Sequence, residues 1–268
     1  MMRRGFTLIE LLVTIVVFAI LGMALARLMV GNSRFVGRQE AQLEARQTAR
    51  AAMNVVVTEL RMVSDGGLLG ASADSVRVRV PYAFGVLCRS GYALLAPPDS
   101  AAYAAAAPSG IAYQQTGGTY AFNGSVTVTG TTASTTECDT DSLRLVPGGR
   151  RITLSSTSVA PAGTIFYLFQ NVTYKFATSA ALPGRRALWR NTSAGNEELL
   201  APFASSARFA FLVGARLTVQ TTVPTPLSLV RGLELRLTGE SEDAPAGASA
   251  PTQFPLSPRV KFMNQLPL

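Results

Sequence analysis

The side chains that most often carry enzymatic chemistry are scarce in this sequence. Its 268 residues contain no histidine and two cysteines, Cys88 and Cys138. A Ser-His-Asp triad, a Cys-His pair and a histidine general base are therefore excluded, and a zinc site would lack its usual ligands. Glu137, Asp139 and Asp141 cluster beside Cys138 in a Thr/Ser-rich stretch, which is typical of a solvated turn, with a weak Ca²⁺ site as the alternative. We expect no catalytic residue, no metal site and no cofactor.

The chain is basic, with 24 Lys and Arg against 16 Asp and Glu and a formal net charge of +8. Proteins that bind nucleic acid carry such charge as clusters of Lys and Arg on one face. Here Lys175 and Lys261 are the two lysines of the sequence, and the arginines are spread as singles and pairs. The distribution therefore does not favour a nucleic-acid site.

A mostly apolar segment, 6–30, follows a short leader that contains Arg3 and Arg4. Its length exceeds the about 20 residues that a membrane-spanning helix needs. A secretory signal peptide would have a small-residue cleavage site before a polar mature start, and none follows this segment, so we expect the segment to be kept. The two leader arginines favour a cytoplasmic N-terminus, which places most of the chain outside the cytoplasm.

Glu10 is the one acidic residue of this apolar segment. A carboxylate deep in a bilayer costs roughly 2.5–3.5 kcal/mol on insertion scales, so it needs a cation or a shallow position. Two explanations are open. Glu10 either lies at the interface close to Arg3 and Arg4, or pairs with a cation from another molecule.

Residues 4–13, Arg-Gly-Phe-Thr-Leu-Ile-Glu-Leu-Leu-Val, resemble the leader and N-terminal helix of type IV pilins and type II secretion pseudopilins at every position. The resemblance implies that a prepilin peptidase cuts between Gly5 and Phe6 and methylates the new amino group of Phe6. It also implies that the Glu10 carboxylate pairs with the terminal amine of a neighbouring subunit during filament assembly.

The helical pattern continues from Asn32 to Val63 without proline. Asp65-Gly66-Gly67 predicts the end of the helix. Three glycines earlier in the helix are positions where the helix could bend. The charges of this stretch form no favourable pair along the helix, which predicts either a solvated face or pairing with the helices of neighbouring subunits. The apolar face of its second half consists of Met53, Val56, Val57, Leu60 and Val63.

Beyond Gly67 the pattern changes to short strand-like runs. Segments 75–80 and 231–237 alternate apolar and polar residues with period two. A long helix followed by antiparallel strands predicts an α+β fold with a β-sheet head on a helical stalk. Further candidate strands are 83–88, 119–129, 165–169, 172–176, 187–190, 207–213 and 217–221, separated by turns that include Asn171, Pro183-Gly184 and 224–226.

These patterns, together with what the pilin resemblance implies for the leader and the filament, divide the chain into four parts. They are a leader (1–5), a transmembrane and filament-core helix (6–30), an amphipathic stem helix (31–65) and an extracytoplasmic β-rich head (66–268). Within the head, two stretches rich in Ala, Pro, Ser and Gly are expected to be surface loops. These stretches are 96–118 and 239–258.

In an extracytoplasmic compartment a disulfide between Cys88 and Cys138 is favoured over free thiols. Closing that loop would contribute roughly 4 kcal/mol in the chain-entropy model. The sequence does not establish that the two cysteines meet.

Residues from about 170 to 265 are similar to the second half of W-type minor pilins and J-type minor pseudopilins. The two resemblances together imply a minor subunit of a type IV pilus or type II secretion filament, in its tip or priming complex. Its partners would be prepilin peptidase, other minor and major pilins or pseudopilins, and the inner membrane, which it crosses once before it enters the filament. The alternative is a membrane-anchored binding or adhesion module for a surface, DNA or a secreted substrate. Nucleic acid is expected as a partner only at the tip of a DNA-uptake filament.

Overall fold

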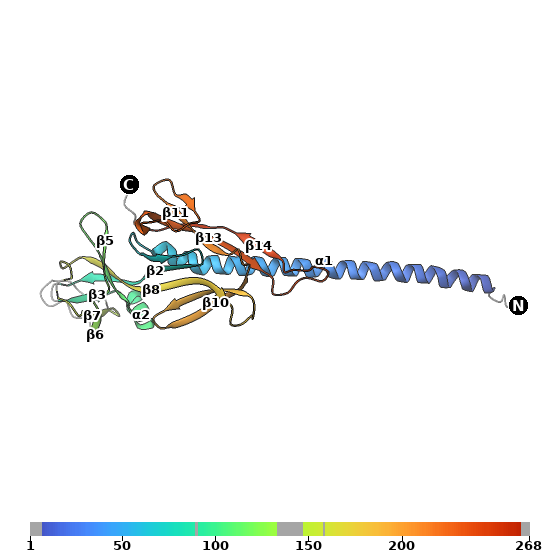
Figure 1. The fold of residues 1–268 in the computed structure, drawn as a ribbon. Helices are drawn as coiled ribbons and strands as arrows, with labels where there is room; N and C mark the ends of the chain where they lie inside the picture. Colours follow the sequence, from blue (N-terminus) through green and yellow to red (C-terminus); the bar gives the residue numbers. More distant parts are fainter. Residues whose placement is uncertain (1–6, 89–90, 133–146, 158, 264–268) are drawn as a thin grey trace.

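A computed structural model of the chain describes residues 7–88, 91–132, 147–157 and 159–263. They form a long N-terminal helix, a short second helix and a sheet of 15 strands. The N-terminal half of the long helix projects from one end of the head, while its C-terminal half lies along the strands (Figure 1). The expected α+β fold is therefore confirmed.

Helix α1 runs from Leu8 to Met62 as one unbroken element of 55 residues, about 80 Å at 1.5 Å per residue. It begins with a capping box, in which the Thr7 hydroxyl accepts a hydrogen bond from the Glu10 N–H and the Glu10 carboxylate accepts one from the Thr7 N–H. It ends where Val63 adopts an extended conformation, followed by Gly66 at φ +73°. The glycines within α1 do not interrupt it.

The head consists of short antiparallel strands around two long ones. The strands are β1 (Leu68–Ala71), β2 (Ser75–Leu87), β3 (Tyr92–Leu95), β4 (Gly110–Gln114), β5 (Tyr120–Asn123), β6 (Val128–Thr132), β7 (Arg150–Leu154), β8 (Ile165–Thr178), β9 (Arg186–Thr192), β10 (Gly195–Phe203), β11 (Arg208–Val213), β12 (Thr218–Gln220), β13 (Val230–Glu240), β14 (Gln253–Leu256) and β15 (Arg259–Lys261). Helix α2 (Pro97–Ala105) and a 3-10 turn, η1 (Leu227–Leu229), complete the described elements.

The main path of the sheet is β12-β11-β13-β10-β9-β8-β2-β3-β7-β6. Off this path, β1 pairs with β2, β14 and β15 pair with β13, and β4 joins β8 to β5. The ladder between β2 and β8 extends from Ser75↔Lys175 to Val86↔Ile165, with an irregularity between Pro81 and Ala83. These two strands therefore run through the whole head.

The two largest hydrophobic cores of the described head both include residues of β2 and β8, and two smaller clusters lie beside them. The base, as we call the part around α1, packs Val56 and Leu60 of the helix against buried residues such as Val78 and Tyr174 of the long strands. The apical part consists of α2, β3–β7 and the adjoining halves of β2 and β8, with a core that includes Ile152. In Figure 1 the apical part lies at the end of the head remote from the N-terminus.

Two expectations about the head were wrong. Segment 96–118 is not a loop, because it contains α2 and β4, and β4 pairs with β8 through buried backbone at Ile111 and Ala112. Asn171 is not a turn, because it lies within β8, opposite Arg79 of β2. In both cases pairing with a distant strand outweighs a weak local preference.

A stripe of small residues lets β13 approach α1 closely. Gly239 of β13 lies directly on the helix, where an added Cβ would come within 2.2 Å of the Ala45 carbonyl oxygen. The facing side chains of α1 are buried alanines, which leave room for a strand backbone. This alanine stripe consists of Ala41, Ala45, Ala49 and Ala52.

Nearer its C-terminal end, α1 is joined to the sheet by a polar contact. The Glu59 carboxylate accepts a hydrogen bond from the Tyr174 hydroxyl and pairs with Arg190 Nε at 3.2 Å. Burial, and next the Glu59 charge, raises the pKa of Tyr174. Burial lowers the pKa of Arg190, but the neighbouring Glu59 outweighs it, so the net shift is upward. Glu59 therefore fixes the helix against β8 and β9.

Other stem charges also contact the head of their own chain. Glu44 accepts a hydrogen bond from the Glu242 N–H at 2.9 Å, and the Arg46 guanidinium lies 5.1 Å from the centre of the Phe254 ring. The local charge pattern predicted either a solvated face or pairing with the helices of neighbouring subunits. Glu44 and Arg46 do neither, because both contact the head of their own chain. The reason is that β13, β14 and their connection cover this side of the stem.

Substituting Gly239 by Ala should destabilise the chain by about 1–3 kcal/mol, since the new methyl group would overlap helix backbone that cannot move aside. Thermal unfolding of the full chain in detergent micelles, followed by circular dichroism, measures the effect. Gly70→Ala is the matched control, because a Cβ there would lie 3.9 Å from its nearest neighbour. Equal melting temperatures for the two variants would contradict the close contact.

Glu59→Gln should lower stability by roughly 1.5–3 kcal/mol, the range for hydrogen bonds to charged groups, because Tyr174 and Arg190 lose a shared anionic acceptor. The same unfolding measurement applies. Glu40→Gln removes an exposed glutamate of the same stem and should change stability by no more than about 0.5 kcal/mol. A Glu59 variant as stable as the Glu40 variant would show that the contact contributes nothing.

Candidate functional site: the exposed half of the N-terminal helix

From Thr7 to Val36 every described residue is exposed, although most of these side chains are apolar. Phe18, for example, has 71% of its surface exposed. A soluble protein rarely leaves so much contiguous apolar surface uncovered. Helix α1 is long and apolar enough to cross a membrane, and none of its most apolar stretch is buried within the chain.

The head covers only the other half of α1. Buried helix residues begin at Ala41 and continue to Leu60. The connection between β13 and β14 extends furthest toward the N-terminus, and it reaches the helix near Arg34, which lies 3.5 Å from where a Cβ on Gly247 would be. Nothing in the described head reaches residues before this point, so the apolar half needs a surrounding from outside the chain.

Glu10 lies in the first turn of α1, among exposed apolar side chains. Its Oε2 atom accepts hydrogen bonds from the Thr7 N–H and the Thr7 hydroxyl, both at 3.0 Å. Among the described residues, its Oε1 atom has no hydrogen-bond partner and no basic group lies within ion-pair distance. One oxygen therefore remains available for a further donor.

The other site residues expected from sequence are only partly described. Gly5, Phe6 and Cys138 lie outside the described residues, as does the acidic cluster beside Cys138. Cys88 lies buried at the end of β2, where it packs against Leu94. The proposed disulfide and any Ca²⁺ site of the acidic cluster therefore stay predictions.

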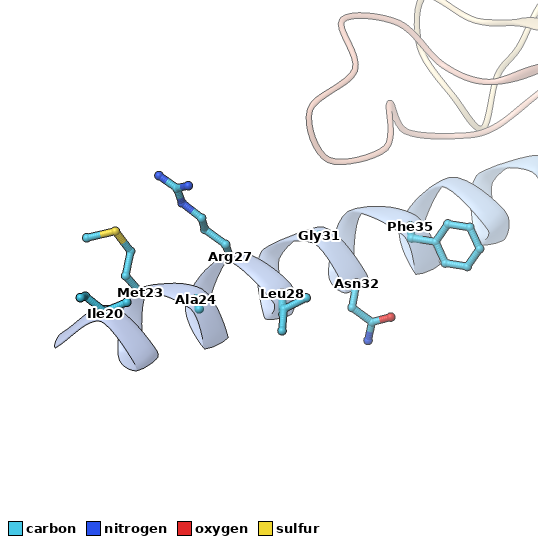
Figure 2. Close-up of a pocket in the computed structure, with 8 residues that line it drawn as sticks. All are labelled: Ile20, Met23, Ala24, Arg27, Leu28, Gly31, Asn32 and Phe35. Carbon is cyan, nitrogen blue, oxygen red and sulfur yellow. The ribbon is translucent and has the colours of Figure 1, made fainter. Parts of the chain in front are cut away.

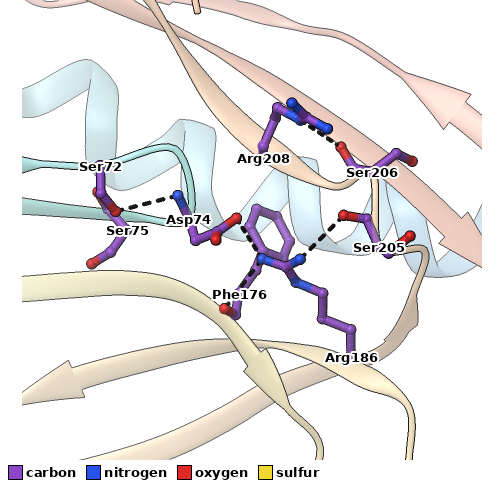
Figure 3. Close-up of polar contacts among 8 residues, drawn as sticks. All are labelled: Ser72, Asp74, Ser75, Phe176, Arg186, Ser205, Ser206 and Arg208. Atoms are coloured by element: carbon purple, nitrogen blue, oxygen red, sulfur yellow. Dashed lines mark hydrogen bonds and ion pairs between the residues drawn. The ribbon is translucent and has the colours of Figure 1, made fainter. Parts of the chain in front are cut away.

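A polar pocket of about 490 Å³ lies at the base, between the ends of β8, β9, β10 and β13. Both of its arginines already have acidic partners: Arg186 pairs with Asp74 at 2.5 Å, and Arg185 pairs with Glu240 at 3.4 Å. Figure 3 shows Arg186 reaching Asp74 on one side and the Ser205 carbonyl on the other. Two carboxylates thus balance the two arginine charges. The ion pairs link the start of β9 to the residue before β2 and to the end of β13.

Glu198 adds a further polar contact at this end of the base. Burial raises its pKa, but hydrogen bonds from the Ser179 hydroxyl and the Ala180 N–H outweigh this, so the net shift is downward. Arg185, Arg186 and Glu198 were missed in the sequence analysis because their partners lie far away along the chain. Within the part of the chain that the structure describes, no group of His, Cys, Asp or Glu side chains could hold a metal ion.

Comparison with known proteins bears on the N-terminal segment alone. The family model of the prokaryotic N-terminal methylation motif matches residues 1–26. No curated protein and no solved structure matches the chain.

The match covers the leader and the first turns of the exposed apolar helix, and the α+β head on a long helical stalk has the architecture of a pilin. The motif points to a structural subunit, which fits a membrane anchor, processing by prepilin peptidase and assembly with other pilins. The match over this segment therefore supports a precursor of the type IV pilin and pseudopilin type.

Proposed function

We propose that the chain is a minor pilin or pseudopilin that is stored in the inner membrane and then assembles through α1 into a type IV pilus or type II secretion filament. The observation that carries this proposal is the division of α1. One half is buried by the head, and the other is apolar and uncovered. A bilayer covers that half during storage, and the helices of sibling subunits cover it in the filament.

The orientation rests on the leader motif, because prepilin peptidase acts on the cytoplasmic side of the membrane. Arg3 and Arg4 of this leader fit a cytoplasmic N-terminus. The head then folds outside the cytoplasm, with α1 crossing the membrane once. Prepilin peptidase cuts between Gly5 and Phe6 on the cytoplasmic side and methylates Phe6.

Glu10 supplies the specific contact of assembly. Its capping box with Thr7 satisfies one carboxylate oxygen within the chain, which lowers the cost of placing the group in lipid. The other oxygen accepts the methylated amine of a neighbouring Phe6. Two unmatched charges at a similar depth in a low-dielectric layer attract strongly, so the pair draws the incoming helix into register.

The resemblance of residues 170–265 to W-type minor pilins and J-type minor pseudopilins supports a place in the tip or priming complex. The apical part adds a second core beyond the strands that pack on α1. A subunit at the tip has room for such an extension, because no further layer of subunits lies above it.

A membrane-anchored binding module is the second candidate, and one observation favours it. The apical part exposes Phe84 and Ile165, with 42% and 54% of their surfaces accessible, on neighbouring strands β2 and β8. A surface, DNA or a secreted substrate could be bound there. Filaments that persist in a deletion strain while adhesion or uptake is lost would favour this candidate over the structural one.

Co-expression with a prepilin peptidase should shorten the full chain by residues 1–5 and add one methyl group to Phe6. Intact-mass spectrometry followed by N-terminal fragmentation measures both changes. Gly5→Leu should block the cut by placing a bulky side chain at the scissile bond, whereas Gly22→Ala, with nothing within 4 Å of the added Cβ, should be processed normally. Processing of the Gly5 variant at the wild-type rate would contradict the assigned site.

Glu10→Ala should insert into the membrane normally but enter filaments roughly tenfold less, the factor that a loss of about 1.4 kcal/mol produces. Carbonate extraction measures insertion, and immunoblots of sheared filaments measure recruitment. Thr7→Ala is the matched control, because it removes the cap, at about 1 kcal/mol, and keeps the carboxylate. Normal recruitment of Glu10→Ala would refute the pairing, and equal defects in both variants would assign the effect to the cap.

A further inference from the structure

Three arginines share one face of α1 just beyond its most apolar stretch. Arg27, Arg34 and Arg38 are separated by seven and four residues, which places them within about 40° of one another around a helix of 3.6 residues per turn. All three are exposed. Among the described residues, no carboxylate lies within 4.0 Å of any of their guanidinium groups. We call these residues the basic face.

The basic face continues the side of α1 on which the head sits. Ala45, in the alanine stripe, follows Arg27 by 18 residues, about five full turns, and so lies at the same angle. The basic face is therefore directly below the head. The connection between β13 and β14 overhangs it, and Gly247 of this connection lies close to the Arg34 side chain.

A shallow, open apolar groove, lined among the described residues by side chains of α1 alone, adjoins the basic face on the side of the N-terminus. Ile20, Met23, Leu28 and Phe35 contribute to its walls, and Arg27 is the one charged residue among those that line it. Figure 2 shows Arg27 projecting from one side of α1 and Leu28 from the other, with Phe35 further along the helix toward the head. The site thus combines an exposed apolar surface of one helix with a cation at its edge, and this pattern suits an amphipathic ligand with one anionic end.

Depth in the membrane identifies the ligand. If the span starts at Phe6, about 20 residues cross the hydrocarbon layer, so Arg27 falls at the opposite boundary. Arg34 lies about 10 Å further out, and its side chain points back toward the helix N-terminus, as helical side chains do. Arg38, about 16 Å out, acts on the surface through its field, since the Debye length is about 8–10 Å. At this depth the phospholipid phosphate is the available anion.

We infer that Arg27 and its groove bind an anionic phospholipid of the extracytoplasmic leaflet, with Arg34 and Arg38 strengthening the attraction. The phosphate accepts paired N–H bonds from the Arg27 guanidinium, and an acyl chain lies along Ile20 and Met23. This inference rests on the storage of the subunit in the membrane proposed above. The bound lipid pairs charges that have no acidic partner among the described residues, and it holds the head at a fixed height above the bilayer.

The test uses the full chain in mild detergent, with phosphatidylglycerol and phosphatidylcholine of identical acyl chains as probes and native mass spectrometry as the measurement. Wild-type protein should retain phosphatidylglycerol preferentially. The variant Arg27→Gln/Arg34→Gln/Arg38→Gln should bind it at least about tenfold more weakly, given about fivefold for each arginine near an anionic surface. Binding of phosphatidylcholine should weaken less, because its choline cation already balances the charge of its phosphate.

The matched control is Arg50→Gln/Arg61→Gln/Arg216→Gln, which removes the same charge from exposed positions away from the basic face. Arg50 and Arg61 lie about 140° and 160° around α1 from Arg27. This control should retain phosphatidylglycerol like the wild type. Replacing the basic face by three lysines should keep part of the preference, because the charge stays but the paired N–H geometry is lost.

Equal retention of the two lipids by the wild type, or an equal loss in both glutamine variants, would overturn the inference. So would a basic-face variant that keeps its lipid preference but loses crosslinking between copies, since the face would then bind a second subunit. Carbonate extraction separates this inference from the proposed function. A wild-type chain that is extracted from membranes refutes storage in the bilayer, whereas an inserted chain without lipid preference refutes the lipid site alone.

Discussion

The contact between β13 and the alanine stripe holds a helix of about 80 Å to a head that covers less than half of it. Because Gly239 and Ala45 bring backbone against backbone, the helix cannot rotate or slide without a clash. Every side chain of the free half therefore has a defined direction relative to the head. Together with the core contacts of Val56 and Leu60 and the polar contact of Glu59, the contact with β13 makes the helix a rigid part of the subunit.

Charges along α1 are used differently in its two halves. In the buried half, Glu44 and Glu59 accept hydrogen bonds from the head of the same chain. These polar contacts add to the close packing between the helix and the head. In the free half, Glu10 keeps one oxygen without a partner among the described residues, and within the same residues the guanidinium groups of the basic face have no carboxylate partner. The chain satisfies its charges where its own sheet can reach, and leaves the others to a membrane or to neighbouring subunits.

The two cores of the head also have different relations to the helix. The base needs α1, because Val56 and Leu60 fill the centre of its core. The apical part has a core of its own and is linked to the base through the continuous strands β2 and β8. Changes at the apical end can therefore accumulate without disturbing the packing that directs the helix. This separation suits a subunit that assembles through its helix and has its surface properties determined by the apical part.

Local sequence was a good guide to the helix and to strands with one buried face. Val76, Val78 and Val80 alternate with polar residues, and all three are buried as period two requires. It was a poor guide where a segment depends on a distant partner. Ile111 and Ala112 lie in a stretch rich in small residues that carries little strand signal, yet pairing with β8 buries them.

By itself, the sequence determined that the chain starts with a leader motif and an apolar helix, since hydrophobic length and the spacing of Gly5, Phe6 and Glu10 are local properties. Only the tertiary structure decided which side of that helix faces the head and that Glu59 and Glu44 find partners within the chain. It also decided that Arg27, Arg34 and Arg38 lie beneath the head with no acidic partner among the described residues. Such facts depend on which residues meet across more than a hundred positions. Hydrophobic periodicity records that a side chain is covered, but not what covers it.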